Sequence, residues 1–111
     1  MKKLLSTREL PRRWVEEIFQ RAKNFKERGI PTRHRGEWVL MFLEPSTRTR
    51  LSFEKALRRL GMETYLFTSE GSSMKKGETL RDTVLTLQAQ GFEGFVIRTP
   101  VNGHLNEIED L

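Results

Sequence analysis

Hydrophobic residues recur at three- and four-residue spacing in three stretches of the chain, which predicts three amphipathic helices. The stretches are residues 11–28, 51–60 and 79–90, and a helix-ending glycine follows each of them. We expect the apolar side chains of the first two helices to pack in a core. They are Trp14, Val15, Ile18, Phe19, Ala22 and Phe25 in the first helix, and Leu51, Phe53, Ala56, Leu57 and Leu60 in the second.

Short apolar runs alternate with these helices and predict β-strands at residues 37–43, 62–67 and 94–98. Nearly continuous apolar character is typical of parallel strands that are buried on both faces. Residues 68–77 are polar and rich in serine and glycine, which predicts a long exposed loop, and residues 102–111 have the pattern of a helix start. The order of elements predicts an α/β fold of βαβ units, in which a parallel sheet carries helices on both faces.

The composition narrows the class of protein. The chain has 111 residues, of which 36% are hydrophobic and 32% charged, as expected for a globular domain or for part of a larger enzyme. It has no cysteine, which excludes disulfides, thiolate metal sites and cysteine nucleophiles. The longest apolar run, residues 38–43, is far shorter than the roughly 20 residues of a membrane helix, and no signal peptide is visible. We therefore expect a cytoplasmic protein with no membrane partner.

The net charge of +5 is concentrated near the N-terminus, where residues 1–35 contain 11 Lys or Arg and 4 Asp or Glu. A basic segment of this kind could bind nucleic acid, but we favour the interpretation that it is a solvated helix face. No stacking aromatic residues interleave with the basic ones, and no zinc-finger, RNP or basic-zipper pattern is present. We therefore expect no nucleic-acid partner.

Candidate chemistry lies where the predicted strands end, because ligands of parallel α/β sheets bind beyond the carboxyl ends of the strands. Residues 44–50 (EPSTRTR) follow the first strand, turn at Pro45 and open a helix with hydroxyl and guanidinium side chains. The N–H groups and positive dipole end of a helix N-terminus favour an anion, and the side chains add donors. The pattern alone leaves two interpretations open: a phosphate cradle without glycines, or a capped helix start with two surface arginines.

Two motifs carry a resemblance to a known family. Residues 44–54 (EPSTRTRLSFE) resemble the carbamoyl phosphate signature of the aspartate and ornithine carbamoyltransferases, and residues 75–83 (KKGETLRDT) resemble the second conserved segment of that family. The resemblance implies the N-terminal, carbamoyl phosphate-binding domain of such an enzyme over residues 1–111. It implies transfer of the carbamoyl group from carbamoyl phosphate to the amine of aspartate in pyrimidine biosynthesis, giving carbamoyl-aspartate and phosphate. No metal and no organic cofactor is expected.

The resemblance also implies roles for individual residues. Ser46, Thr47, Arg48 and Thr49 are expected to bind the phosphate of carbamoyl phosphate. Thr49 and Arg98 are expected to approach the carbamoyl carbonyl oxygen and to stabilise the charge that develops there, as an oxyanion hole does. Arg48, Thr49 and Arg98 are thus the expected catalytic residues. For Arg98 the alternative is a strand-end arginine in a surface ion pair.

The polar loop is expected to serve a neighbouring subunit. In aspartate-type members a serine and a lysine of this loop reach the adjacent site, and the matching positions here are Ser72, or less directly Ser73, and Lys76. An additional lysine suits a dicarboxylate acceptor better than cationic ornithine. A shared site implies a symmetric oligomer, expected to be a homotrimer, and leaves room for a regulatory or companion chain.

The sequence also departs from the family. The His-Pro-x-Gln segment that should follow Arg98 is absent, as is the second domain that binds the amino acid, so the chain is expected to be incomplete and inactive alone. His34 and His104 are expected to be surface residues. An ornithine-type enzyme and a non-catalytic module that binds carbamoyl phosphate or phosphate remain alternatives.

Overall fold

The computed structural model describes residues 3–69 and 77–111, which fall into two compact units, Met1–Thr32 and Arg33–Leu111. The first unit consists of a short 3₁₀ helix, η1 (Thr7–Glu9), and the helix α1 (Arg12–Arg28). The helix ends where predicted, at Gly29, whose N–H donates to the carbonyl oxygen of Phe25 over 2.9 Å.

Within its own unit the apolar face of α1 is exposed, so the structure does not confirm the prediction that it packs in a core. Trp14, Ile18, Phe19 and Phe25 are 42–69% exposed, and no residue of α1 is buried in the part of the chain that the structure describes. The periodicity of the sequence correctly gave the helix and its apolar stripe. Its own unit offers only η1 as a further element, which is too small to cover a stripe of that length.

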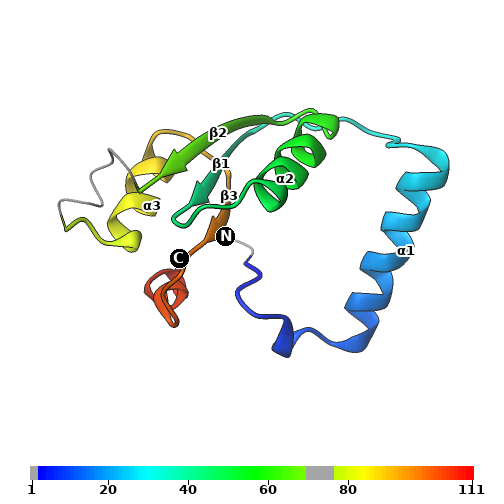
Figure 1. The fold of residues 1–111 in the computed structure, drawn as a ribbon. Helices are drawn as coiled ribbons and strands as arrows, with labels where there is room; N and C mark the ends of the chain where they lie inside the picture. Colours follow the sequence, from blue (N-terminus) through cyan, green and yellow to red (C-terminus); the bar gives the residue numbers. More distant parts are fainter. Residues whose placement is uncertain (1–2, 70–76) are drawn as a thin grey trace. The chain divides into compact units, whose positions relative to one another are not determined.

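The second unit is built on a parallel sheet of three strands, β1 (Glu37–Phe42), β2 (Glu63–Thr68) and β3 (Gly94–Arg98). The strand order is β2-β1-β3, so that the first strand lies in the middle of the sheet (Figure 1). In this register Leu40 lies opposite Leu66 on one side and Val96 on the other. The predicted strands and the α/β class with parallel strands are confirmed.

Two helices connect the strands: α2 (Arg48–Arg59) joins β1 to β2, and α3 (Leu80–Ala89) lies between β2 and β3. The two connections cross the sheet in opposite directions, so right-handed crossovers put the helices on opposite faces. A short 3₁₀ helix, η3 (His104–Ile108), replaces the predicted start of a C-terminal helix and packs against α3. No helix in the described ranges combines the length and apolar character of a membrane span.

The core is centred on β1. Successive side chains of a strand point to opposite faces, and Val39, Leu40, Met41 and Phe42 are all at most 4% exposed, so both faces of the strand are covered. On one face Leu40 and Phe42 pack with Leu57 of α2, together with the partly buried Trp38, Met62 and Val96. Leu80, Val84 and Ile108 are buried as well.

The contribution of α2 to this core is smaller than predicted. In the described chain Leu57 is the buried residue of α2, whereas Leu51 and Phe53 are 49% and 44% exposed. The helix packs mainly on β1 and β2, so only part of its apolar face meets the sheet. The helix also begins three residues before the predicted start, because its first turn is polar and carries no hydrophobic signal.

One glycine is required by the packing of the central strand. A Cβ atom on Gly94 would lie 2.1 Å from the indole ring of Trp38, which is far inside van der Waals contact. Trp38 and Gly94 are paired across β1 and β3. Because glycine has no side chain, Gly94 leaves the space on the sheet that the indole of Trp38 occupies.

Truncating Leu40 tests the central position of β1. The substitution Leu40→Ala removes a side chain that is 1% exposed and should lower the free energy of unfolding by about 2–5 kcal/mol, through lost burial and the cavity left behind. Urea denaturation measures the change. The matched control is Leu66→Ala on β2, whose side chain is 52% exposed and whose loss should cost less than about 1 kcal/mol. Equal losses for the two variants would contradict a core built around β1.

Candidate functional site

The carboxyl ends of β1 and β3 lie side by side and bring together two segments that are about fifty residues apart in sequence. The N–H of Leu43 donates to the carbonyl oxygen of Arg98 over 2.8 Å, directly beyond the last residue pair of the two strands. The segment that follows β1 and opens α2 therefore starts next to Arg98. This is the sheet edge at which parallel α/β proteins bind their ligands.

Arg98 is the centre of the polar contacts at this edge. Its Nε donates to the Glu44 carboxylate at 2.6 Å, and its Nη1 lies 3.1 Å from both Ser46 Oγ and Thr49 Oγ1. The side chains of Arg98 and Glu44 are 43% and 30% exposed, so the cluster is open to solvent on one side. The structure thus brings three of the predicted site residues, Ser46, Thr49 and Arg98, into direct contact.

The remaining predicted residues of the first segment lie at the N-terminus of α2. Thr47 is the N-cap residue and Arg48 the first residue of the helix, and both are exposed. The hydroxyl of Thr47 makes no capping hydrogen bond. The carbonyl oxygen of Thr47 accepts a hydrogen bond from the N–H of Leu51. The first turn of α2 therefore presents backbone donors next to the Arg98 cluster.

The structure separates the two arginines of this segment, which the sequence pattern treats alike. Arg50 forms an ion pair with Glu54 one turn further along α2, at 3.4 Å, and Glu54 also pairs with Arg58 at 2.9 Å. Arg50 is therefore engaged along the helix. Arg48 lies at the open end of the helix, where an anion would be received.

Glu44, to which the sequence pattern assigns no role, belongs to the same cluster. It stands between the end of β1 and Pro45, and its carboxylate shares the Arg98 guanidinium with Ser46 and Thr49. The ion pair that was the alternative interpretation of Arg98 is therefore present, and it lies inside the cluster. The sequence did contain a signal for this contact, because Glu44 and Arg98 carry opposite charges at the ends of two predicted parallel strands.

Ser72, Ser73 and Lys76 lie outside the described residues. The description resumes at Gly77, and α3 then begins with Thr79 as its N-cap, whose hydroxyl accepts a hydrogen bond from the N–H of Asp82 over 3.0 Å. The start of α3 is thus a well-formed capped helix.

The amino ends of the strands, opposite the Arg98 cluster, carry mainly negative charge. A cavity of about 430 Å³ lies at the amino ends of the strands. It is lined by Arg35 and by a glutamate at or next to the start of each strand, namely Glu37, Glu63 and Glu93. Within the described residues no group of three acidic or histidine side chains is arranged to hold a metal ion. This cavity lies at the opposite ends of the strands from the Arg98 cluster, and its three glutamates disfavour an anion there.

The two histidines differ from each other. His34 is exposed, as predicted. The prediction for His104 is wrong: its side chain is only 16% exposed, and both of its ring nitrogens have a partner. The histidine is held there because η3 folds back on α3, which the sequence pattern of the last ten residues did not indicate.

The chain belongs to the aspartate/ornithine carbamoyltransferase family. The family model for the carbamoyl-P binding domain matches residues 2–111. Among the curated relatives, the aspartate carbamoyltransferase catalytic subunit of Aquifex aeolicus is 51% identical over 100 residues, which are 90% of this chain and 34% of the relative. The same subunit of Clavibacter michiganensis is 44% identical over 111 residues, covering 93% and 34%. The chain therefore spans about a third of the length of these relatives.

Solved structures agree on the fold. The catalytic subunit of M. jannaschii aspartate transcarbamoylase superposes with a TM-score of 0.81 at 35% identity, over 96% of this chain and 36% of that one. The anabolic ornithine carbamoyltransferase of Campylobacter jejuni reaches 0.83 at 25% identity, over 96% and 35%. Aspartate transcarbamoylase from Trypanosoma cruzi, in complex with carbamoyl aspartate and phosphate, reaches 0.82 at 29% identity, over 96% and 36%.

The glutamates at the amino ends of the strands affect the pKa of Tyr65, the only tyrosine in the sequence. A hydrogen bond from the phenol to Glu63, together with the charges of Glu37 and Glu63, raises the pKa of Tyr65 above its ordinary value of 10.0. The substitution Glu63→Gln should lower the pKa towards 10.0, because it removes the charge that stabilises the protonated phenol. Ultraviolet absorbance of the phenolate measures the titration. Glu93→Gln, in the same cavity, is the control and should leave the midpoint in place.

Proposed function

We propose that this chain is the carbamoyl phosphate-binding domain of an aspartate carbamoyltransferase and provides the phosphate half of its active site. The observation that carries the proposal is the convergence of Ser46 and Thr49 on the guanidinium of Arg98, beside the N-terminus of α2. The family membership and the names of the relatives support it. The activity, the second substrate and the assembly belong to a protein about three times as long, and are part of the proposal.

The phosphate would lie at the first turn of α2. The N–H groups of that turn and the positive end of its dipole attract an anion. Ser46, Thr47 and Thr49 add hydroxyl donors, and Arg48 adds a guanidinium, the side chain best matched to phosphate oxygens. These residues are consecutive and lie on both sides of the helix start, so they surround one position in space.

Arg98 and Thr49 would act on the carbamoyl group. Their donors, one from the end of β3 and one from the first turn of α2, are 3.1 Å apart and can meet at one acceptor oxygen. When the amine of aspartate attacks the carbonyl carbon, negative charge develops on the carbonyl oxygen, and donors already in place stabilise that charge. Phosphate then leaves from the tetrahedral intermediate. The chain contributes orientation and electrostatic stabilisation, and no covalent enzyme intermediate is required.

Glu44 sets the resting state of this arrangement. Its carboxylate holds the Nε of Arg98 at 2.6 Å and so keeps the long side chain extended across the sheet edge towards Ser46 and Thr49. Without such a partner an arginine at a strand end would lose up to about 2 kcal/mol of side-chain entropy on binding a ligand. The ion pair therefore prepares Arg98 for the substrate.

The acceptor and the assembly are proposed from the resemblance to the family. Aspartate is the proposed acceptor, held by a second domain beyond residue 111, and Ser72 and Lys76 are proposed to reach the site of a neighbouring subunit in a homotrimer in the cytoplasm. Ornithine is the second candidate acceptor, because the Campylobacter jejuni ornithine enzyme superposes as well as the aspartate enzymes do.

Binding to the chain itself tests the phosphate half of the site. Carbamoyl phosphate should bind to the 111-residue chain, and Arg98→Gln should weaken binding by roughly 10- to 100-fold, as expected for the loss of a charged hydrogen-bond donor worth about 1.5–3 kcal/mol. Titration calorimetry measures the affinity. The control is Arg59→Gln, which removes an exposed guanidinium from the last turn of α2 and should leave binding unchanged. No heat with the unmodified chain at millimolar ligand would contradict the proposal.

Activity of the full-length enzyme tests the reaction and the role of Arg48. Carbamoyl-aspartate should form from carbamoyl phosphate and aspartate, and Arg48→Ala should lower kcat/KM by about 10² or more, as for removal of an oxyanion-hole donor. Parallel assays with ornithine as acceptor measure the choice of amine. Undiminished turnover of the Arg48 variant would exclude its role, and turnover with ornithine instead of aspartate would replace the proposed reaction.

A further inference from the structure

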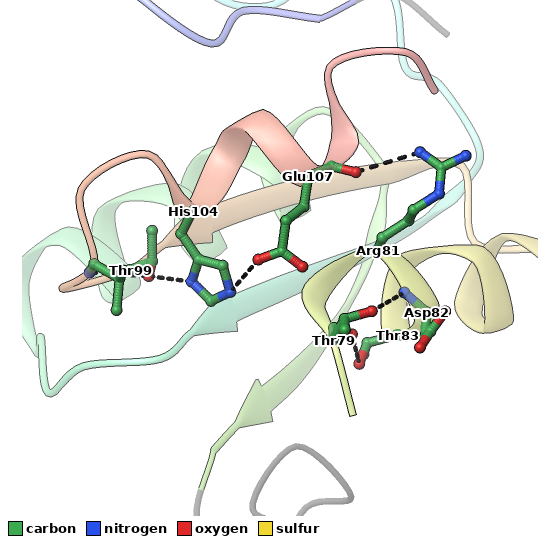
Figure 2. A network of polar contacts seen from close by, with 8 residues as sticks. Thr79, Arg81, Asp82, Thr83, Thr99, His104 and Glu107 are labelled. Atoms are coloured by element: carbon green, nitrogen blue, oxygen red, sulfur yellow. Dashed lines mark hydrogen bonds and ion pairs between the residues drawn. The ribbon is translucent and has the colours of Figure 1, made fainter. Parts of the chain in front are cut away.

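A second chain of polar contacts begins at Thr99, the residue that follows Arg98, and runs through His104 to Glu107 (Figure 2). Thr99 Oγ1 lies 2.7 Å from His104 Nδ1, and His104 Nε2 lies 3.1 Å from Glu107 Oε2. The imidazole is thus held on both sides, by the residue next to Arg98 and by a carboxylate of η3. A two-sided contact of this kind fixes the orientation of a histidine ring.

The far end of this chain is anchored on α3. Arg81 Nη1 donates to the carbonyl oxygen of Glu107 over 3.3 Å, and Arg81 also pairs with Asp110. Ile108, next to Glu107, is 5% exposed. Figure 2 shows Arg81 reaching from its helix to the η3 segment that carries His104 and Glu107. The imidazole is therefore attached to a packed part of the fold.

The direction of each hydrogen bond depends on the protonation of the imidazole. In the neutral imidazole the contact with the Glu107 carboxylate favours the ring proton on Nε2, and Nδ1 then accepts from the Thr99 hydroxyl; in the charged imidazolium both nitrogens donate. The oxygen of that hydroxyl also accepts the N–H of Val101, at 3.3 Å. The Thr99 hydroxyl thus contacts both the imidazole and the backbone of the turn, and it holds the turn in place.

This turn follows directly on the last sheet contact of Arg98. The carbonyl oxygen of Arg98 makes the last contact with the β1 side, to the N–H of Leu43, and sheet pairing ends there. From Thr99 onwards the path of the backbone depends on the hydroxyl contacts to His104 and Val101. Loss of the Thr99 contacts would weaken the hold of Leu43 on the Arg98 carbonyl oxygen, so that the end of β3 could shift and carry the guanidinium with it.

We propose that His104, held by Glu107, is a positioning residue that acts through Thr99 to place the Arg98 guanidinium against Ser46 and Thr49. The consequence for carbamoyl phosphate rests on the proposed function, whereas the positioning itself does not. The contact sequence runs from α3 through η3 and the imidazole to the end of β3. These contacts hold the backbone that follows Arg98, as the pairing with β1 holds Arg98 itself.

Two substitutions of His104 separate its two contacts. The amide of His104→Asn lies near the position of Nδ1 and can keep the contact with Thr99, whereas that of His104→Gln lies near the position of Nε2 and keeps only the contact with Glu107. The readouts are the Nε–H signal of Arg98 in a ¹H–¹⁵N spectrum, identified by its loss in Arg98→Lys, and the affinity for inorganic phosphate by calorimetry.

The expected result is a difference between the two variants. In His104→Gln the Arg98 Nε–H signal should move to the position of a solvated arginine, and phosphate affinity should fall about tenfold, since a small misplacement of a binding group is enough for such a loss. In His104→Asn both readouts should stay near those of the unmodified chain. The control, His34→Asn, replaces the exposed histidine and should change neither readout.

A second pair of variants keeps the test decisive if His104→Gln fails to fold. Thr99→Val keeps the shape of the side chain without the hydroxyl and should displace the Arg98 signal, whereas Thr99→Ser should preserve it. Folded Gln and Val variants with an unchanged Arg98 signal would overturn the proposal, as would equal losses in His104→Asn and His104→Gln. If the unmodified chain does not bind phosphate, the proposed function fails, and the Arg98 signal still decides the positioning role.

Discussion

The parallel pairing of β1 with a strand on each side is the constraint on which the rest of the structure depends. Because the strand is buried on both faces and paired on both edges, its carboxyl end is fixed, and so is the start of the segment that follows. The same pairing puts Arg98, at the end of β3, next to that segment. A site made from residues about fifty positions apart therefore arises from the register of one central strand.

The Arg98 cluster combines two properties that the sequence presents as alternatives. Arg98 is in an ion pair with Glu44, and it also contacts two hydroxyls of the helix start. A partly exposed ion pair contributes little to stability, so its main effect is on the conformation of the arginine. The contacts of Glu44 on one side and of the Thr99 turn on the other reduce the freedom of a side chain that would otherwise sample many rotamers.

The strands and helices were largely predictable, because apolar periodicity and helix-ending glycines are local signals. The β3 strand, for example, has the predicted bounds. Burial was less predictable. The stripe on α1 has clear helical spacing, yet Phe19 is 69% exposed, since periodicity indicates which face is apolar and not what covers it. His104 shows the opposite error, because the short η3 helix that buries it depends on contacts with α3, far away in sequence.

The sequence by itself determined the class of fold, the segment that opens α2, and the family, because each depends on short runs of consecutive residues. Only the tertiary structure decided which cations share one site. It set Arg50 apart, paired along its helix with Glu54, and placed Arg98 against Ser46 and Thr49 with Glu44 as its counter-ion. The physical reason is that hydrogen bonds and ion pairs act over about 3 Å, and only the folded sheet brings residues so distant in sequence within that distance.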